Sequence, residues 1–274
     1  MAMPNELVFV RHGESEANIV QQADKDGRAH EMGELVYDRP DWEQRLSSSG
    51  IEQARRAKQW IDAHLGGVAS FDFRYFSPFL RTRETAAYIG GPDCDDWIIE
   101  DRVVERSWGL YGAISRGDRE KMFELTTKMY KQSPWYTKLE GGESRYEVSD
   151  RFRDFQGTLH REAAGKRVLV VTHGDFMGIA RYNIERMLPE QFEQVEHDRS
   201  QILRNCSILH YSRRNPADDS DVREKLNWRR IVHPPDVESS PFGGRWVELP
   251  ARPKYTGAAL LSQAERAARL IPDE

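Results

Sequence analysis

The sequence predicts an α/β protein: a three-layer sandwich with a largely parallel central sheet, helices on both faces and a C-terminal extension. Short apolar runs alternate along the chain with longer segments of helical periodicity, the pattern of parallel strands joined by helical crossovers. Two of these runs, at 7–10 and 168–171, are each followed closely by a His-Gly pair. Ligands of such sheets bind beyond the carboxyl ends of the strands. Both pairs are therefore expected in one crevice.

The first half of the chain begins with a strand and continues with strand–helix units. Residues 6–10 predict a buried strand, because they are apolar and partly β-branched. A helix is expected from about 50 to 65, where Ser49 and Glu52 have the spacing of a capping box and two glycines follow. The next expected elements are a strand within 71–78, a helix at about 79–89, and a strand with its exit loop at 97–105.

The second half repeats the alternation. A helix is expected over about 144–163, since Ser144 and Glu147 form another capping-box pair before an apolar stripe. The clearest strand of the chain follows and leads into a helix that ends before Pro189. The ranges are 167–171 for this strand, 175–188 for the helix, and 206–213 and 226–233 for two later strands joined by a loop at 215–221.

One domain is expected over residues 1–235, with insertions at about 19–46 and 110–143. Both insertions are predicted to be irregular, and ordered loops of this length are usually lids or binding loops. Residues 236–274 are rich in Pro and Gly and end in an Ala-rich helical tail. They are expected to form an extension packed on the domain.

Composition argues against several classes of partner. The net charge of −5 gives no indication of affinity for nucleic acid or for an anionic membrane. No run approaches the roughly 18 apolar residues of a membrane span, and the first residues lack a basic signal-peptide region. Two cysteines, Cys94 and Cys206, do not make a disulfide framework and are most simply small buried residues. A cytoplasmic protein is expected, with its oligomeric state left open.

Four residues with charged or imidazole side chains come soon after predicted strands. Each has an ordinary structural explanation when taken alone. His12 could be a turn residue, and Arg81 a surface helix residue paired with a neighbouring glutamate. Glu105 could be a loop carboxylate, and His173 a hydrogen-bonded residue at a strand end. Their joint occurrence at the carboxyl ends of strands favours a functional site.

At this point the motifs show a resemblance. Between residues 5 and 185 the chain carries, in order, VRHGESEAN, LSSSGIEQA, SPFLRTRETA, ERSWG, GGES and VVTHGD. Together they resemble the histidine phosphatase superfamily, also called phosphoglycerate mutase-like. The resemblance implies phosphoryl transfer through a phosphohistidine, with no metal or other cofactor. The substrate would be a small phosphorylated molecule.

The resemblance also implies roles for individual residues. His12 matches the nucleophile, Glu105 matches the proton donor, and Arg11, Arg81 and His173 match the residues that hold the phosphoryl oxygens. The resemblance further implies two substrate contacts, an amide contact from Asn18 and a close backbone approach at Gly174.

Physical chemistry is consistent with these roles. An imidazole must be neutral to attack phosphorus, and neighbouring guanidinium groups lower its pKa. Paired arginines suit a phosphoryl group, because each planar fork meets two oxygens. The pKa of Glu105 should be raised toward 6–7 for general acid catalysis. Glu100 and Asp101 lie close in sequence and are rivals for this role.

The sequence departs from the glycolytic mutases of the family. Those enzymes place a second glycine four residues after the first and carry an Arg-Arg pair in the insertion that follows the glutamate. Here Gly112 follows Gly109 after three residues, and 113–140 holds no such pair. A phosphomonoesterase is therefore favoured. A phosphoglycerate mutase-like phosphotransferase and a non-catalytic phospho-ligand binding protein remain as alternatives.

Other cofactors find no support in the sequence. The remaining histidines show no clustered metal-ligand spacing, and there is no nucleotide-binding P-loop. The insertion after Glu105 is basic and aromatic. It is either a lid over an anionic or sugar-like substrate or a solvated helix with long lysine side chains.

Overall fold

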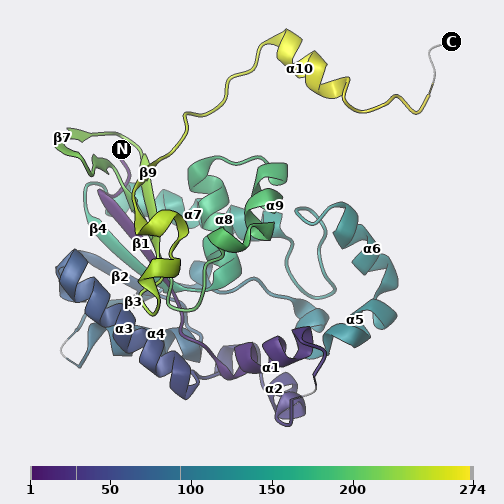
Figure 1. Cartoon of the computed structure of the whole chain (residues 1–274), viewed down its shortest axis with the longest axis horizontal. Coiled ribbons are helices and arrows are strands. Elements are labelled where there is room, and N and C mark those ends of the chain that lie inside the picture. The colour runs from purple at the N-terminus through teal and green to yellow at the C-terminus, as the bar shows by residue number, and fades with distance from the viewer. Residues whose placement is uncertain (1, 29, 93, 272–274) are drawn as a thin grey trace.

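A seven-stranded sheet forms the centre of the protein, in the order β3-β2-β4-β1-β5-β8-β9. The computed structural model describes residues 2–28, 30–92 and 94–271, and Figure 1 shows their arrangement. The strands of this sheet are β1 (Glu6–Arg11), β2 (Phe73–Phe76), β3 (Trp97–Ile99), β4 (Arg167–Thr172), β5 (Ile208–Ser212), β8 (Trp228–Val232) and β9 (Val247–Glu248). A separate hairpin pairs β6 (Arg214–Asn215) with β7 (Asp218–Val222).

Strand direction confirms the largely parallel sheet. Strands β3, β2, β4 and β1 are mutually parallel neighbours. Strand β5 is antiparallel to β1, β8 is antiparallel to β5, and β9 is antiparallel to β8. Strand β8 therefore runs with the first four, and only β5 and β9 run the other way.

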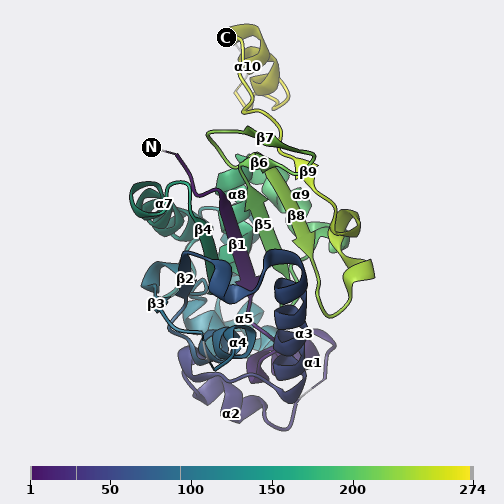
Figure 2. The same cartoon turned by 90° about the vertical axis from the view of Figure 1, so that its left-hand side faces the viewer.

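Helices cover both faces of the sheet, as the three-layer prediction requires. Helices α3 and α4 pack on one face of the sheet and α7 and α8 on the other. Figure 2 shows α3 in front of the strand ends and α8 and α9 behind the strands. The helices are α1 (Glu16–Lys25), α2 (Gly33–Asp38), α3 (Ser48–Leu65), α4 (Leu80–Gly90), α5 (Arg116–Met122), α6 (Glu124–Gln132), α7 (Arg145–Glu162), α8 (Gly174–Glu185), α9 (Pro189–His197) and α10 (Gly257–Ala264).

The apolar run of β1 is continuous because both of its faces are buried. Leu7 and Phe9 belong to the core beneath α7 and α8, whereas Val8 and Val10 belong to the core beneath α3 and α4. All four side chains are inaccessible to solvent. Successive strand residues point to opposite faces, so a strand between two helical layers needs apolar residues at every position.

The pairing of β1 with β4 explains why a His-Gly pair follows each of these strands. Arg11 lies opposite Thr172, at the carboxyl ends of neighbouring parallel strands. The next residue of each strand is a histidine, and the His12 amide donates to the Thr172 carbonyl at 2.9 Å. The fold thus delivers both imidazoles to one edge of the sheet.

Helix ends agree with the sequence at α7 and differ at α3 and α8. Ser144 and Glu147 form the expected capping box. Helix α3 is instead capped by Ser47, whose Oγ accepts from the Gly50 amide at 3.0 Å, so the choice of Ser49 was wrong. Helix α8 ends at Glu185, earlier than predicted. Three consecutive serines, 47–49, stand at the start of α3, and Ser47 is the one held by Glu14, through its hydroxyl and its amide.

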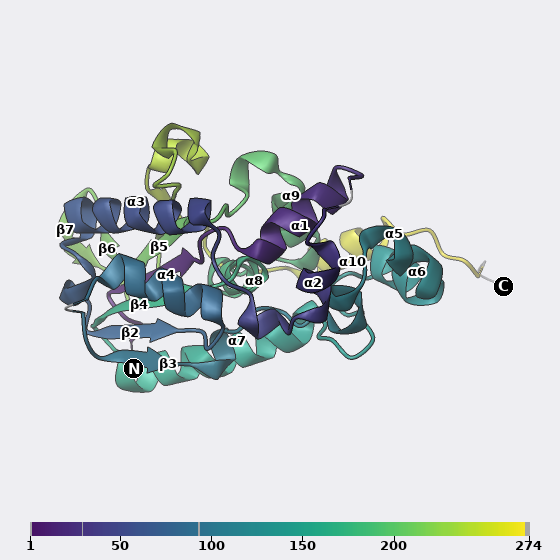
Figure 3. The ribbon, with the colours of Figure 1, turned by 90° about the horizontal axis from the view of Figure 1, so that it is seen from below.

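The insertions and the later loop contain more regular structure than expected. Residues 19–46 hold most of α1 and all of α2, and 110–143 hold α5 and α6. Figure 3 shows these four helices beyond one end of the sheet. The segment at 215–221 is part of the β6–β7 hairpin rather than a plain loop. Helices α2 and α6 bury none of their residues, so they lie at the surface of the protein.

The C-terminal extension has two parts. Strand β9 pairs with β8, and Ser240, Pro241 and Leu249 are buried. Beyond Leu249 the chain differs from the expected packed extension, because nearly every side chain of 250–271 is exposed. Helix α10 stands away from the body in Figures 1 and 2. Among the described residues, no helix combines the length and apolarity needed to cross a membrane.

Candidate active site

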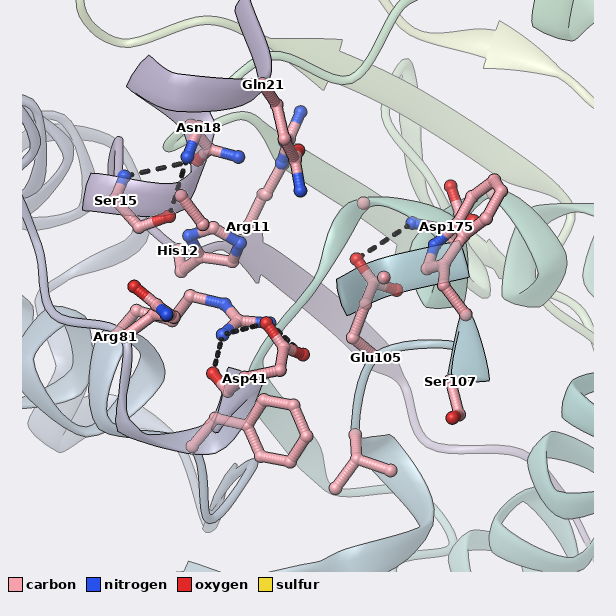
Figure 4. A pocket seen from close by; sticks show the side chains of 18 of the residues that line it. Arg11, His12, Ser15, Asn18, Gln21, Asp41, Arg81, Glu105, Ser107 and Asp175 are labelled. Atoms are coloured by element: carbon pink, nitrogen blue, oxygen red, sulfur yellow. Dashed lines mark hydrogen bonds and ion pairs between the residues drawn. The ribbon is translucent and has the colours of Figure 1, made fainter. Parts of the chain in front are cut away.

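The two histidines lie side by side at the carboxyl edge of the sheet. Their ring centroids are 5.2 Å apart and the rings are inclined at 61°. His12 is only 3% exposed, and His173 is fully buried. Arg11 and Arg81 gather near His12 at the same end of a pocket, as Figure 4 shows.

The His12 ring is oriented by its own backbone. Its Nδ1 lies 2.7 Å from the Gly13 carbonyl oxygen, which can only accept a hydrogen bond. Nδ1 therefore carries the proton, and the lone pair is on Nε2. Burial, followed by the charges of Arg81 and Arg11, lowers the pKa of His12 well below its ordinary value. His12 is therefore neutral, and the lone pair of its Nε2 is available.

His173 is held through its other nitrogen. Its Nε2 lies 2.8 Å from the Ser77 hydroxyl, while its buried Nδ1 has no hydrogen-bond partner among the described residues. Burial and the charge of Arg81 lower its pKa well below the ordinary value. A buried ring nitrogen without a partner is costly, which favours a role in contacting a bound group.

Arg11 is fixed by the main chain. Its Nη1 donates to the Leu203 carbonyl at 2.6 Å, and its buried Nε has no partner among the described residues. A Cβ atom at Gly174 would lie 3.2 Å from the Arg11 Cζ atom. Gly174 therefore leaves room for the guanidinium group. A direct contact between Gly174 and a ligand stays a prediction.

Arg81 is bound to a residue that the sequence did not single out. Arg81 is the second residue of α4, with its guanidinium above the Phe79 ring at 4.9 Å. Its Nη1 donates to the Asp41 carbonyl oxygen at 2.6 Å, and its two Nη atoms meet the Asp41 carboxylate at 3.0 and 3.1 Å. Asp41 begins a short 3-10 turn in the first insertion.

Glu105 lies at the amino end of α8. Its carboxylate accepts from the Phe176 amide at 3.2 Å and the Asp175 amide at 3.4 Å, and also from the Arg106 amide at 3.0 Å. Burial and the charge of Asp175 raise the pKa of Glu105 to about 7. These two effects outweigh the opposite effect of the amides and of the arginines. A carboxyl group with this pKa can both give and take a proton near neutrality.

The rivals of Glu105 lie elsewhere. Glu100 is paired with Arg102, at 2.6 Å between Oε2 and Nη2. Neither Glu100 nor Asp101 lines the pocket, whereas Glu105 does. Of these three carboxyl groups Glu105 is the one that borders the pocket, and its role as proton donor stays a prediction.

Asn18 and Asn205 hold the loop that follows β1 and carries His12. Asn18 Oδ1 accepts from the Ser15 amide at 3.2 Å and from Asn205 Nδ2 at 3.0 Å. Asn205 Nδ2 also donates to the His12 carbonyl at 3.1 Å. Because the oxygen of Asn18 is occupied, its amide nitrogen is the group left to contact a ligand. No motif included Asn205 or Asp41, and Ser77 stands in the SPFLRTRETA motif without having been assigned a role. Their contacts join distant parts of the chain.

The pocket has a volume of about 980 Å³. Its walls come from the strand ends, from the first insertion, from the segment after Glu105, and from α8 and α9. Trp42 belongs to the first insertion and Gly112 to the second, and both line the pocket. Both predicted insertions therefore border the candidate site. Among the described residues, no group of three or more His, Cys, Asp or Glu is arranged to hold a metal ion.

Comparisons with known proteins agree with the motifs. The family model described as histidine phosphatase superfamily (branch 1) matches residues 7–217. A 2,3-bisphosphoglycerate-dependent phosphoglycerate mutase of Parvibaculum lavamentivorans is 30% identical over 197 residues, which cover 69% of this chain and 84% of the relative. Phosphoserine phosphatase 1 of Hydrogenobacter thermophilus is 29% identical over 168 residues, which cover 61% of this chain and 70% of that relative.

A solved structure shares the fold. The α-ribazole phosphatase of Shigella flexneri superposes with a TM-score of 0.60 at 18% identity, covering 81% of this chain and 96% of that one. The curated relatives thus include both a mutase and a phosphatase.

Proposed function

Because the chain belongs to the histidine phosphatase superfamily, we propose that it is a metal-independent phosphomonoesterase that acts through a phosphohistidine on His12. The observation that carries the proposal is the state of His12. Its Nδ1 proton is bound to the Gly13 carbonyl, and burial together with two guanidinium groups lowers the pKa of the ring, which keeps it neutral. This arrangement presents Nε2 as a nucleophile.

The first step transfers the phosphoryl group to the enzyme. His12 Nε2 forms a bond to phosphorus while the bond from phosphorus to the alcohol oxygen breaks. Glu105 gives its proton to the leaving oxygen, so the alcohol departs neutral. Arg11, Arg81 and His173 surround the phosphoryl oxygens, where fixed donors stabilise the charge of the transition state.

The second step regenerates the enzyme. Glu105, now a carboxylate, takes a proton from a water molecule whose oxygen attacks phosphorus. The bond between phosphorus and Nε2 breaks, inorganic phosphate leaves, and Glu105 is again protonated. The pKa of about 7 suits both halves of this cycle.

One wall of the pocket, the wall beside α8, favours hydrolysis over mutase activity, while Lys25 and Arg119 line the pocket elsewhere. A mutase must hold a second anionic group of its substrate. Beyond the phosphate end, Arg181 is paired with Glu185 at 2.9 Å and Arg39 with Glu16 at 3.0 Å. Asp175 and Glu196 line the wall beside α8. This wall suits hydroxyl or ammonium groups better than a second anion.

The mutase-like phosphotransferase is the second candidate, and the 30% identity to a phosphoglycerate mutase supports it. Two assays separate the candidates. The first measures phosphate release from p-nitrophenyl phosphate and a panel of sugar phosphates, with a chelator present. The second measures interconversion of phosphoglycerates with the bisphosphate primer added.

We expect chelator-resistant phosphate release and an acid-labile phosphoprotein, both absent in His12→Ala. Interconversion without net phosphate release would favour the mutase. Phosphate binding without either reaction would favour the non-catalytic alternative.

A further inference from the structure

The guanidinium group of Arg81 is already bound by another residue of the chain, Asp41. Both of its terminal nitrogens are bound to Asp41, through a two-pronged contact with the carboxylate and a third bond to the carbonyl oxygen. An arginine makes the same two-pronged contact with two oxygens of a phosphoryl group. Asp41 thus occupies the donors that the proposed reaction needs.

The burial of the two partners is unequal. The Arg81 side chain is 5% exposed, while that of Asp41 is 59% exposed. Arg81 lies near Arg11 and two neutral histidines, and a buried cation without a counter-ion is costly. Asp41 supplies that counter-ion from the solvent side. A bound phosphate dianion would supply it from inside the pocket, which makes the two ligands alternatives.

The chain around Asp41 is attached to the body at its flanks. On one side Arg39 pairs with Glu16 at 3.0 Å. On the other side Glu84 accepts from Arg45 Nε at 2.9 Å and from the Leu46 amide at 2.7 Å. Between these anchors lie residues 40–43. Among the described residues, their hydrogen bonds to distant parts of the chain are those that Arg81 donates to Asp41.

The segment also has an internal brace. Gln44 is 2% exposed, and its Nε2 donates to the Val36 carbonyl at 2.8 Å and to the Arg39 carbonyl at 3.3 Å. These bonds join the chain on the two sides of residues 40–43. If Asp41 leaves Arg81, residues 40–43 can shift while these bonds stay in place.

We propose that Asp41 is a displaceable internal ligand of Arg81, which a substrate phosphoryl group replaces when it binds, releasing the 40–43 segment from the phosphate end of the pocket. The proposal relies on the proposed function only in treating Arg81 as a phosphate contact. A dianion has more charge and more oxygens to offer Arg81 and Arg11 than the single carboxylate. The exchange therefore favours phosphate monoesters over monoanions.

The first test measures affinity for inorganic phosphate and orthovanadate by calorimetry in the full chain. Asp41→Asn removes the competing charge, and we expect both ligands to bind roughly three- to tenfold more tightly, because less of the arginine is withheld. The matched control is Glu43→Gln, which removes an exposed carboxylate from the same turn outside the pocket. Its affinities should stay within about twofold of the parent protein.

The opposite result has a clear meaning. If Asp41 instead holds Arg81 in the orientation that phosphate needs, Asp41→Asn binds both ligands less tightly. An unchanged affinity would also overturn the proposal, because a competitor cannot be removed without effect.

A second readout reports the segment itself. Trp42 follows Asp41, is 57% exposed and lines the pocket. Saturating orthovanadate should change the tryptophan emission of the parent protein, and this change should be largely lost in Trp42→Phe. An identical response in both proteins would show that the segment stays in place and would refute the exchange.

Neither readout needs turnover. Failure of the proposed phosphatase activity would appear as no ester hydrolysis, while phosphate titrations of Asp41→Asn would still decide the role of Asp41.

Discussion

The ends of β1 and β4 follow the same plan of strand, histidine, glycine and helix, yet they provide different things. After β1, Ser15 and Asn18 form a capping box that satisfies the start of α1. After β4, His173 is itself the cap residue of α8 and offers no side-chain cap. The first amides of α8 donate instead to Glu105. The start of α1 is capped by its own residues, whereas the start of α8 binds and positions Glu105, the candidate acid.

The two imidazoles also differ in the nitrogen that is held. His12 is fixed at Nδ1 by a backbone carbonyl and lines the pocket. His173 is fixed at Nε2 by Ser77 and is fully buried. The same His-Gly pair therefore yields a candidate nucleophile at one strand end and a candidate oxygen contact at the other. At His12 the partner is a carbonyl oxygen, which can only accept, so the lone pair is on Nε2. At His173 the partner is a hydroxyl, which can donate or accept, and it holds the ring while Nδ1 stays without a partner among the described residues.

The largest expected effect separates the two histidines. His12→Asn should lower kcat on p-nitrophenyl phosphate by about 10⁴-fold or more, because no other group can form the covalent intermediate. His160→Asn, a half-buried position on α7, is the control and should be near the parent value. Residual activity within tenfold of the parent would contradict the assignment of the nucleophile.

His173→Asn should have a smaller effect. We expect a loss of roughly 10²- to 10³-fold in kcat, the range for removal of one donor to a transition-state oxygen. Rapid-quench trapping should still detect phosphohistidine on His12. A variant that forms no phosphoenzyme at all would remove the distinction between the two strand ends.

Glu105→Gln tests the acid at the start of α8. We expect about 10²-fold lower kcat on alkyl phosphates and a smaller loss on p-nitrophenyl phosphate, whose leaving group needs little protonation. In the parent protein kcat for alkyl phosphates should decline as pH rises through about 7, where Glu105 ionises. A pH profile that keeps this decline in Glu105→Gln would exclude Glu105 as its source.

The smallest expected effect concerns stability. The pKa of Glu105 is raised from 4.5 to about 7 in the folded protein, so between these values the folded state binds more protons than the unfolded state. Stability from this group is therefore present at low pH and lost as pH rises from about 4.5 to 7. Glu105→Gln should gain on the order of 3 kcal/mol over the parent at pH 8 but little at pH 4.5, by denaturant titration.

His12 affects the pH dependence of stability in the opposite direction from Glu105. Its pKa is lowered on folding, so the unfolded chain binds more protons below its ordinary value of about 6.5. Its contribution to stability is lost as pH falls below that value. The free energy of unfolding of His12→Asn should fall less on acidification than that of the parent protein. An equal fall in both proteins would contradict this prediction.

The local sequence determined the main elements and the residues of the phosphate end. Apolar runs marked β1 and β4, because a strand buried on both faces must be apolar throughout. The capping box at Ser144 marked the start of α7. The motifs placed Arg11, His12, Arg81, Glu105 and His173 at strand ends and helix starts, and the structure brings all of them together. Their roles in catalysis stay predictions for the experiments above.

Only the tertiary structure decided which groups complete and control this site. Asp41 meets Arg81 across 40 residues of sequence, Ser77 meets His173 across 96, and Asn205 meets His12 across 193. No periodicity or capping signal reports such contacts, since each depends on how separate elements pack. The local sequence fixes which side chains are available at a strand end. Which nitrogen is free, which arginine is occupied and which carboxyl holds a proton follow from the neighbours that folding brings to them.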